Sequence, residues 1–412
     1  MLRRIHSIRA GIDPKLLAKN TITVASAFVW YFLAYNLITS LEEPLGIAIT
    51  DLEHLLIVGS GTLGIAVSAL FGSLVINRYW KRDRFLLYWT LAGVFLSFIP
   101  LCLFPWSASN LIVLSTIFGS YFGLGTPATM GFFASSTNHE NRGRTGGITF
   151  LAIGMCFFVM GNLGVGSLIA ASIVLAAIRL TGLASFFLLG SNETPPLEQG
   201  KSTYKEVVRN RSFALYFIPW IMFNLVDYLT IPVINNLSLL QNIDAFRSIS
   251  FLENGLIAIV AIITGFLIDT KGRKRLAIFG FAFLGIGYAF LGFFPNITGL
   301  IFFTIADGIA WGSFNVIFLF TLWGDIAKNR GSEKFYVMAA LPYLFANLMY
   351  VITTPTMAGI EPTQVFTFAS FFLFLSVLPL VFAPETLPEK AMKQRELKIY
   401  IEKAQEIAQK YY

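Results

Sequence analysis

The chain has 412 residues, of which 56% are hydrophobic and only 13% are charged. Water-soluble domains carry about 25% charged residues, so this composition excludes a soluble globular protein. The net charge of +7 would suit a nucleic-acid-binding protein, but the cations occur in short clusters between long apolar runs, so we expect no nucleic-acid partner.

Twelve apolar windows are long enough for a helix to cross the ~30 Å hydrocarbon core. They run roughly over 21–41, 54–76, 85–105, 109–134, 145–166, 168–190, 213–240, 249–268, 276–295, 298–323, 335–357 and 363–383. This pattern predicts an all-α polytopic membrane protein with 12 transmembrane helices in two six-helix bundles. The first bundle covers 1–190 and the second covers 212–384. A cytoplasmic linker at 191–211 joins them, and an amphipathic tail at 385–412 follows.

The cations predict the orientation of these spans. Of the 30 Lys and Arg residues, all except Arg179 and Arg247 fall at the N-terminus, in alternate connections, in the linker or in the tail. Cytoplasmic loops carry the excess of Lys and Arg, so both termini and the linker are expected in the cytoplasm. We expect a multi-pass monomer in the lipid bilayer of the plasma membrane.

The stretch from Gly265 to Arg275 ends the eighth window with an acid followed by four cations. Glycine allows close helix approach and tight turns, and Asp269 at a helix end can pair with a cation or with the N–H groups of another helix. Three short segments recur in order about 190 residues apart, the first being Gly72–Ile76, which returns as Gly265–Asp269. The recurrence supports two parallel six-helix halves.

At these residues the chain resembles the major facilitator superfamily over essentially its full length. The family signature Gly-x-Leu-x-Asp-Arg/Lys-x-Gly-Arg/Lys-Arg/Lys is matched by residues of the second half, whereas the first-half copy keeps only Gly72 and Leu74. The resemblance implies a cytoplasmic gate that closes in one state. The residues expected in this gate are Gly265, Asp269, Gly272, Arg273, Arg142 and Arg330. The cations Lys271, Lys274 and Arg275 are expected mainly to fix the orientation.

A second similarity concerns the ends of the two halves. Glu193-Thr194-Pro195-Pro196 returns as Glu385-Thr386-Leu387-Pro388, with Pro384 before the second copy. This looks like the Pro-Glu-Thr/Ser element of sugar porters and related metabolite:proton symporters. The glycine-rich motif of drug antiporters in the fifth span lacks its proline here, which weakens an antiporter interpretation.

Buried polar side chains are the candidates for the transport site, because a carrier binds its substrate near the middle of the membrane. In the superfamily the first, fourth, seventh and tenth spans line the cavity. By this resemblance, with residues of the eleventh span added, the candidate substrate-binding residues are Tyr35, Asn36, Asn224, Tyr228, Trp311, Asn315, Tyr343 and Asn347.

Asp227 and Asp307 are the candidates for proton coupling. Counting ~1.5 Å per residue from the span ends places both some 10 to 15 Å below the external surface. A carboxylate at that depth is costly unless it is paired, hydrated or protonated. The first span lacks a central acid, so any coupling must occur in the second half. The alternative is that each carboxyl group only hydrogen-bonds to a neighbour.

Two features of the first half have structural interpretations. Arg179 lies near the middle of the sixth span, where it either faces an anionic substrate or, as we favour, snorkels toward a phospholipid headgroup. Gly61, Gly64, Ser68 and Gly72 form a stripe of small residues, which predicts helix packing where the two halves slide.

We conclude that the sequence predicts a secondary active transporter that moves a small polar metabolite, either a sugar or an organic acid, by proton symport. The alternatives are proton-coupled efflux of a drug or metabolite and a transporter-like sensor that does not transport. A membrane enzyme is disfavoured because His6, His54 and His139 lie at or beyond span ends, and neither a cofactor nor a metal is expected.

Overall fold

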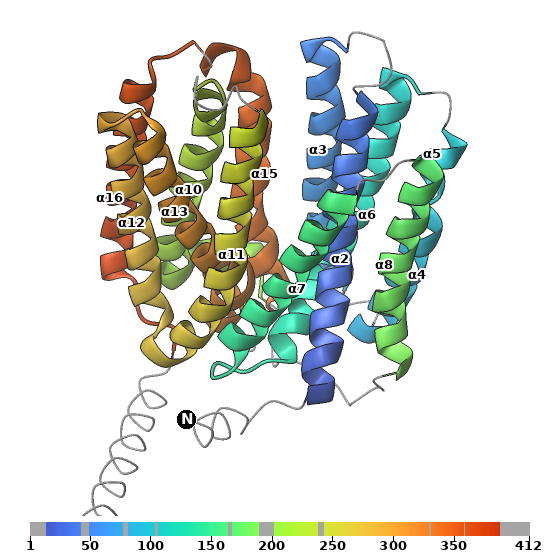
Figure 1. Cartoon of the computed structure of the whole chain (residues 1–412). Helices are drawn as coiled ribbons and strands as arrows, with labels where there is room; N and C mark the ends of the chain where they lie inside the picture. The colour runs from blue at the N-terminus through green and yellow to red at the C-terminus, as the bar shows by residue number, and fades with distance from the viewer. Residues whose placement is uncertain are drawn as a thin grey trace, which may run out of the picture.

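The computed structural model describes residues 14–42, 49–76, 81–103, 106–163, 167–188, 202–237, 243–328, 331–357 and 359–387. Every element of these residues that crosses the molecule is helical (Figure 1). The predicted tail beyond 387 and the first part of the linker lie outside the described residues.

The described residues of the first half form seven helices, of which α4 and α5 together form the third predicted span. This span is broken at Ser97–Phe98, directly before Pro100. The helices are α2 (Pro14–Glu42), α3 (Asp51–Val75), α4 (Arg82–Leu96), α5 (Ile99–Cys102), α6 (Ala108–Ser135), α7 (Arg142–Leu163) and α8 (Leu168–Leu188).

The predicted linker contains a short helix, α9 (Tyr204–Arg209), and the second half follows it directly. The tenth predicted span is not a uniform α-helix, because a π-helical segment interrupts it. The helices are α10 (Arg211–Asn235), α11 (Ile243–Lys271), α12 (Arg273–Phe293), α13 (Ile297–Phe314), the π-helix η3 (Asn315–Thr321), α14 (Leu322–Ala327), α15 (Glu333–Met357) and α16 (Pro362–Phe382).

Polar side chains fix where several of these helices begin. Thr50 and Glu53 form a reciprocal capping box at the start of α3, and Asn210 accepts hydrogen bonds from two N–H groups at the start of α10. Ser107 and Asn296 cap α6 and α13 in the same way. Such caps satisfy N–H groups that the helix leaves unpaired, so they locate helix starts that hydropathy alone leaves imprecise.

Eleven helices among the described residues are long and apolar enough to cross a membrane. Helix α7 occupies the position of the fifth predicted span but is outside this set, and its side chains are described only as far as Cys156. The structure therefore shows a polytopic helical membrane protein with two groups of helices separated by the linker.

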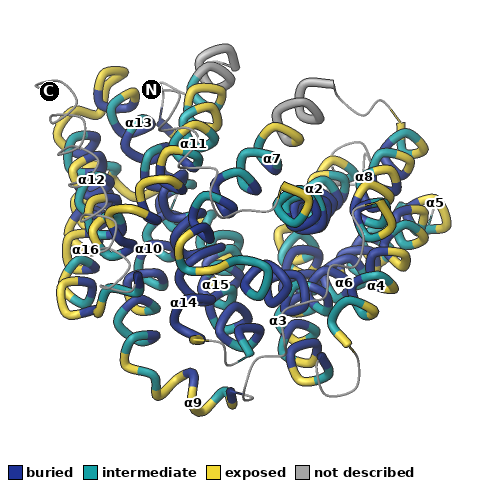
Figure 2. The backbone as a smooth tube through the Cα atoms, turned by 90° about the horizontal axis from the view of Figure 1, so that it is seen from below, coloured by how far each residue is buried: buried dark blue, intermediate teal, exposed yellow. Residues whose placement is uncertain are grey.

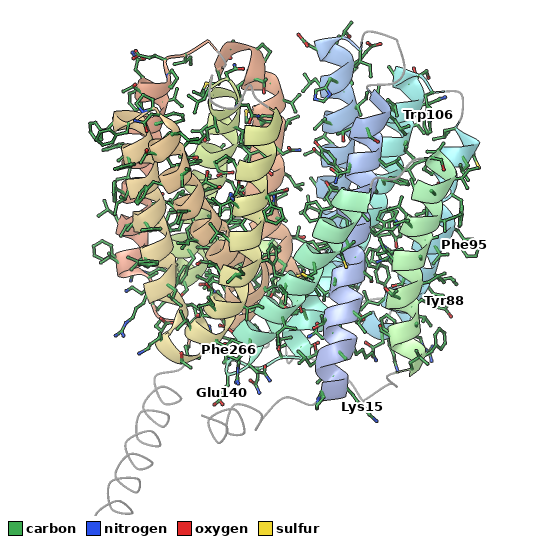
Figure 3. The ribbon with its side chains drawn as sticks, in the orientation of Figure 1. Lys15, Tyr88, Phe95, Trp106, Glu140 and Phe266 are labelled. Carbon is green, nitrogen blue, oxygen red and sulfur yellow. The ribbon has the colours of Figure 1, made fainter. Side chains whose placement is uncertain are left out.

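The two groups lean together at the lower end in Figure 1 and apart at the upper end. Helices α7 and α11 pack against each other between the groups, as do α3 and α15. Viewed from below, buried residues line the inner faces of the helices and exposed residues lie on the outer faces (Figure 2). Tyr88 and Phe95 are examples of outward-pointing aromatic side chains (Figure 3), which suits contact with lipid.

The small-residue stripe of α3 packs within the first half. A Cβ atom added to Gly61, Gly64 or Gly72 would meet Ser115, Thr116 or Leu124, all on α6, at 3.3 Å or less. The prediction of close helix packing is confirmed, but its location between the halves was wrong. The stripe faces α6 because the smallest residues allow these two helices to approach most closely.

Candidate functional site

Asp269 on α11 connects the second half to the start of α7 in the first half. Its carboxylate accepts hydrogen bonds from the backbone N–H groups of Gly143 and Arg144, both at 2.9 Å. The side chains of Arg144 and Arg273 lie 3.3 Å and 3.4 Å from its oxygens. A fully buried acid is thus placed on the N-terminus of a helix and between two cations, where its charge is best compensated.

Two glycines make this arrangement possible. Gly272 has φ of +95°, a backbone conformation that favours glycine, and it reverses the chain between α11 and α12. At Gly265 an added Cβ would lie 2.6 Å from the carbonyl oxygen of Gly143, so only glycine lets α11 approach α7 this closely.

Asp325 on α14 forms a second buried contact between the halves. It pairs with Arg142 of α7 and with Arg273, whose Nε lies 3.0 Å away, and His139 Nδ1 lies 2.9 Å from its Oδ1. The Arg273 guanidinium also donates to the carbonyl of His139. Arg142 was expected as a loop charge, but it is the first residue of α7 and is buried. Arg330, the remaining predicted gate residue, lies outside the described residues.

A third bridge between the halves was not predicted. Arg82 at the start of α4 pairs with Glu333 in the first turn of α15, and it also donates to Ser135 Oγ at 2.9 Å. Sequence reasoning missed this bridge because the signature motif of the first half is eroded at 76–80. Glu333 at a helix start was the available signal, since an acid there can receive a cation from a facing helix.

The Pro384-Glu385-Thr386 segment holds the start of α12. The Glu385 carboxylate accepts from the backbone N–H groups of Arg273 at 2.8 Å and Lys274 at 3.1 Å, and the Pro384 carbonyl accepts from Tyr216. Thr386 Oγ1 lies 3.4 Å from Asp325. We call the lower-end set that joins the halves the gate cluster. It comprises Arg82, His139, Arg142, Gly143, Arg144, Asp269, Arg273, Asp325 and Glu333.

The gate cluster lies at one end of the molecule. Its members form hydrogen bonds that join the two halves. Glu140 and Phe266, at the ends of the connected helices, appear at the lower end in Figure 3, whereas Trp106 appears at the upper end. Within the described residues, the hydrogen bonds of the gate cluster therefore join the two halves at this end of the molecule.

A separate group of carboxyl side chains lies deep within the second half. Asp227 on α10 is 8% exposed and Asp307 on α13 is 6% exposed, and they are close enough to repel each other electrostatically. Asp227 Oδ1 accepts a hydrogen bond from Trp311 Nε1 at 3.2 Å, whereas Asp307 Oδ1 has no partner. The two predicted coupling residues are thus brought together.

Glu253 on α11 completes the group and was missed by sequence reasoning. Its carboxyl group is close enough to interact electrostatically with both Asp307 and Asp227. It lies ten residues after the start of α11, where an acid resembles a span-end charge. We call Asp227, Asp307 and Glu253 the carboxyl cluster.

Tyrosine side chains connect the carboxyl cluster to the first half. Tyr228 packs edge-on against Tyr343, with ring centroids 5.4 Å apart, and it interacts electrostatically with Asp227. Tyr343 also interacts with Tyr31 on α2, which in turn interacts with Tyr35. Three predicted binding residues, Tyr35, Tyr228 and Tyr343, therefore belong to one group that includes Tyr31, a residue the sequence did not single out.

The other predicted binding residues are more scattered. Asn224 is fully buried, and its side-chain N–H donates at 2.6 Å to the carbonyl of Trp220 in its own helix. Asn36 is exposed. Asn315 begins the π-helix, and Asn347 is half-buried on α15.

Arg179 on α8 does not snorkel. It is 0% exposed inside the first half, stacked 4.2 Å from the Trp89 ring centroid, and hydrogen-bonded to the Tyr121 hydroxyl. Its Nε and Nη1 atoms have no hydrogen-bond partner. The snorkelling interpretation was wrong, because aromatic rings of α4 and α6 enclose the guanidinium.

Comparisons with known proteins agree with this architecture. The family model described as the Major Facilitator Superfamily matches residues 20–321. A search of curated protein sequences finds no significant match.

Two similar solved structures are both membrane transporters. The crystal structure of the human organic anion transporter MFSD10 (TETRAN) has a TM-score of 0.62 and 14% identity, and the match covers 89% of this chain and 100% of that chain. The proton:xylose symporter XylE bound to 6-bromo-6-deoxy-D-glucose has a TM-score of 0.64 and 15% identity, and the match covers 90% of this chain and 96% of that chain. At these identities the likeness shows the fold alone.

Proposed function

Because this chain belongs to the major facilitator superfamily and is a membrane transporter rather than an enzyme, we propose that it imports a neutral polar metabolite, such as a sugar, by proton symport. The observation that carries this proposal is the carboxyl cluster beside tyrosines from both halves. Protons would be held by the carboxyl groups, and the substrate would bind at the tyrosines, with Trp311 between the two sites.

Proton binding follows from the chemistry of the carboxyl cluster. Three carboxylates in one buried group would repel each other strongly in a medium of low dielectric constant. A proton shared between the neighbouring carboxyl groups of Glu253 and Asp307 would relieve part of this repulsion. Release of that proton during the cycle would couple proton movement to transport.

The positions of the buried cations favour a neutral substrate over an organic acid. Within the described residues the buried cations are Lys19, Arg142, Arg179 and Arg273. Arg142 and Arg273 belong to the gate cluster, Lys19 lies against Phe132 and Phe186 near the start of α2, and Arg179 stacks on Trp89. The tyrosines offer hydroxyl groups and aromatic faces, which suit the hydroxyl groups and C–H faces of a sugar.

We propose that the gate cluster closes the cytoplasmic side, with twelve spans and both termini in the cytoplasm of a cell whose plasma membrane holds the protein. The distribution of cations supports this orientation. The conformation would then open outward. Return to the inward-open state requires the gate cluster to separate, which is the alternating-access step.

Uptake into proteoliposomes tests the proposal. Purified protein is reconstituted and offered labelled D-xylose, D-glucose or succinate, with and without an inward proton gradient. We expect a gradient to drive accumulation of a sugar. Asp307→Asn and Asp227→Asn should each abolish accumulation against a gradient, whereas Asp51→Asn, which changes an exposed acid, should not.

Several outcomes would contradict the proposal. Gradient-driven accumulation that survives both Asp→Asn substitutions would remove the carboxyl cluster from coupling. Accumulation of succinate alone would favour an organic-anion carrier, which the similarity to an organic anion transporter also brings into consideration. Substrate efflux driven by an inward proton gradient would favour the antiporter alternative, and binding without movement would favour a sensor.

A further inference from the structure

We propose that Glu253 is the port through which protons reach the buried pair Asp307 and Asp227. This inference rests on the proposed proton coupling and adds a third residue with a distinct role. Glu253 lies on α11, a different helix from those of the two buried aspartates.

Close packing of α11 on α13 places the Glu253 side chain at Asp307. An added Cβ at Gly308 would lie 2.8 Å from Leu256 Cβ and 3.3 Å from the carbonyl oxygen of Glu253. One turn further, an added Cβ at Gly312 would lie 2.7 Å from the carbonyl oxygen of Ile257. Small residues at this spacing allow the backbones of α11 and α13 to approach closely. This approach brings the carboxyl groups of Glu253 and Asp307 near each other.

The members of the carboxyl cluster differ in their access to solvent. Glu253 is partly exposed and lies between the exposed residues Leu252 and Asn254. Asp307 is buried, and its Oδ1 has no hydrogen-bond partner, so it has an unused position for accepting a proton. Access therefore decreases from Glu253 to Asp307, and a proton entering the cluster meets Glu253 first.

The position of Glu253 along α11 supports entry from the side opposite the gate. Glu253 is 18 residues before Lys271, which at ~1.5 Å per residue places it about 27 Å above the gate end of the same helix. At that level the two halves lean apart in Figure 1. In the conformation described here, the port would be reached while the gate cluster is closed.

The transfer needs no other reactant. A protonated Glu253 gives its proton to a carboxylate oxygen of Asp307, forming one O–H bond as the other breaks, and Glu253 is left as a carboxylate. It then takes a proton from water on the open side. Glu253 is then back in its starting state and Asp307 holds the proton, which has moved inward by one carboxyl group; the pair returns to its starting state when Asp307 releases that proton.

The other titratable groups around Glu253 are acids or weak acids. Asp307 faces it from α13, Asp227 interacts with it from α10, and the Tyr288 hydroxyl on α12 interacts with all three carboxyl groups. The described part of α7 contributes the Cys156 thiol, two residues beyond the contact of Gly154 with Ala258. The π-helix η3 has no titratable side chain. None of these residues has a basic side chain, so no basic group among them could replace Glu253 as the proton carrier.

Hydrogen–deuterium exchange of the carboxyl groups tests the port without any substrate. The full-length protein in lipid vesicles is transferred to D₂O, and the shift of the protonated carboxyl C=O infrared band is followed over time. The part of the band lost in Asp307→Asn identifies Asp307. In Glu253→Gln we expect exchange of that part to slow by ~100-fold, the low end of what a positioned acid–base group contributes.

Two further variants keep the result interpretable. Glu253→Asp retains a carboxyl group and should restore fast exchange, which a purely structural role for the side chain would not produce. Glu361→Gln removes an exposed acid beside α16 and should leave exchange unchanged. Wild-type exchange rates in Glu253→Gln would overturn the port. That result would leave the coupling role of Asp307 standing, because coupling is judged separately by gradient-driven uptake.

Discussion

At the scale of single residues, Asp269 is the buried acid of the gate cluster that joins α11 to the start of α7. Its carboxylate accepts hydrogen bonds from two backbone N–H groups of α7 and from the Arg144 side chain, forms an ion pair with Arg273, and has no solvent exposure. A buried charge held in this way is costly to remove, because its partners remain buried after it has gone. The neighbouring Lys271 is exposed in the same chain reversal.

We therefore predict that Asp269→Ala destabilises the protein by about 3–5 kcal/mol, the usual effect of removing one partner from a buried ion pair. Thermal unfolding in detergent measures the change. Lys271→Ala is the matched control and should be nearly neutral, because an exposed cation at this position contributes little to stability. Equal effects of the two substitutions would mean that Asp269 contributes no more to stability than the exposed Lys271 does.

For Arg179 we expect that loss of the charge has little effect on stability, in contrast to Asp269. Its guanidinium donates to the Tyr121 hydroxyl rather than to an acid, and two of its nitrogens have no hydrogen-bond partner. An apolar side chain of similar length can therefore replace it at little cost. We predict that Arg179→Met keeps wild-type thermal stability and sugar uptake. Arg179→Ala should destabilise by about 3 kcal/mol, because it leaves a cavity beside Trp89.

Loss of uptake in a folded Arg179→Met protein would contradict this prediction. It would show that the charge itself is needed, as an anion-binding role requires. Such a result would also favour the organic-anion alternative over the neutral substrate.

Residue patterns predicted the role of a residue well where the relevant residues lie close together in one sequence motif. Asp269 and Gly272 were identified from their spacing, and both occupy the turn at the end of α11. Glu253 and Glu333 were missed because hydropathy treats an acid near a span end as a solvated charge. Their partners, Asp307 and Arg82, come from other helices and cannot be assigned without the packing.

At the scale of helices, the sequence predicted the spans but not their irregularities. The tenth span changes to a π-helix over Asn315–Thr321, where Thr321 Oγ1 donates to the carbonyl of Val316 at 2.7 Å. Such segments occur mostly at functional sites, and this one follows Trp311 and Asp307 in the same span. Hydropathy is insensitive to one residue added to a helical turn, so no apolar window could have shown it.

The pairing of helix starts across the molecule can be tested by charge reversal. Arg82→Glu or Glu333→Arg alone should place like charges together at the α4–α15 contact and should reduce uptake and lower the unfolding temperature. The double variant should recover part of both losses, because the opposite charges are restored. Losses that simply add in the double variant would show that the two side chains do not interact in the working protein.

At the scale of the whole molecule, the two halves contact along α7 and α11 as well as at the gate cluster. An added Cβ at Gly154 would lie 3.7 Å from Ala258 Cβ, within the range that a disulfide requires. Both native cysteines, Cys102 and Cys156, are exposed and can be replaced with serine before the new pair is introduced.

We predict that a Gly154→Cys, Ala258→Cys protein forms a disulfide under mild oxidation and then loses uptake. A covalent bond between the halves opposes their relative movement, and reduction should restore transport. The single-cysteine proteins, treated in the same way, should remain active. Full uptake by the oxidised double variant would mean that this contact is a fixed hinge, and that opening occurs only nearer to the gate cluster.

The division of the molecule into two halves was predictable because short sequence segments recur in both. The recurrence of Gly72–Ile76 as Gly265–Asp269 indicated two similar halves, and the gap at 191–211 separated them. The repeat could not show which helices meet, and it placed the glycine stripe of α3 at the wrong interface. That assignment depends on contacts between residues far apart in the chain.

The distribution of charge in the gate cluster sets the two halves apart. In the ion pairs that join them within the gate cluster, the acid comes from the second half and the basic side chain from the first, as in Arg144 with Asp269 and Arg82 with Glu333. Halves descended from one repeated unit would begin with identical faces. Here the faces are complementary, so a chain assembled from two copies of the first half would oppose cation to cation and could not close. Each half therefore has a charged face that is complementary to the other half and not to a second copy of itself.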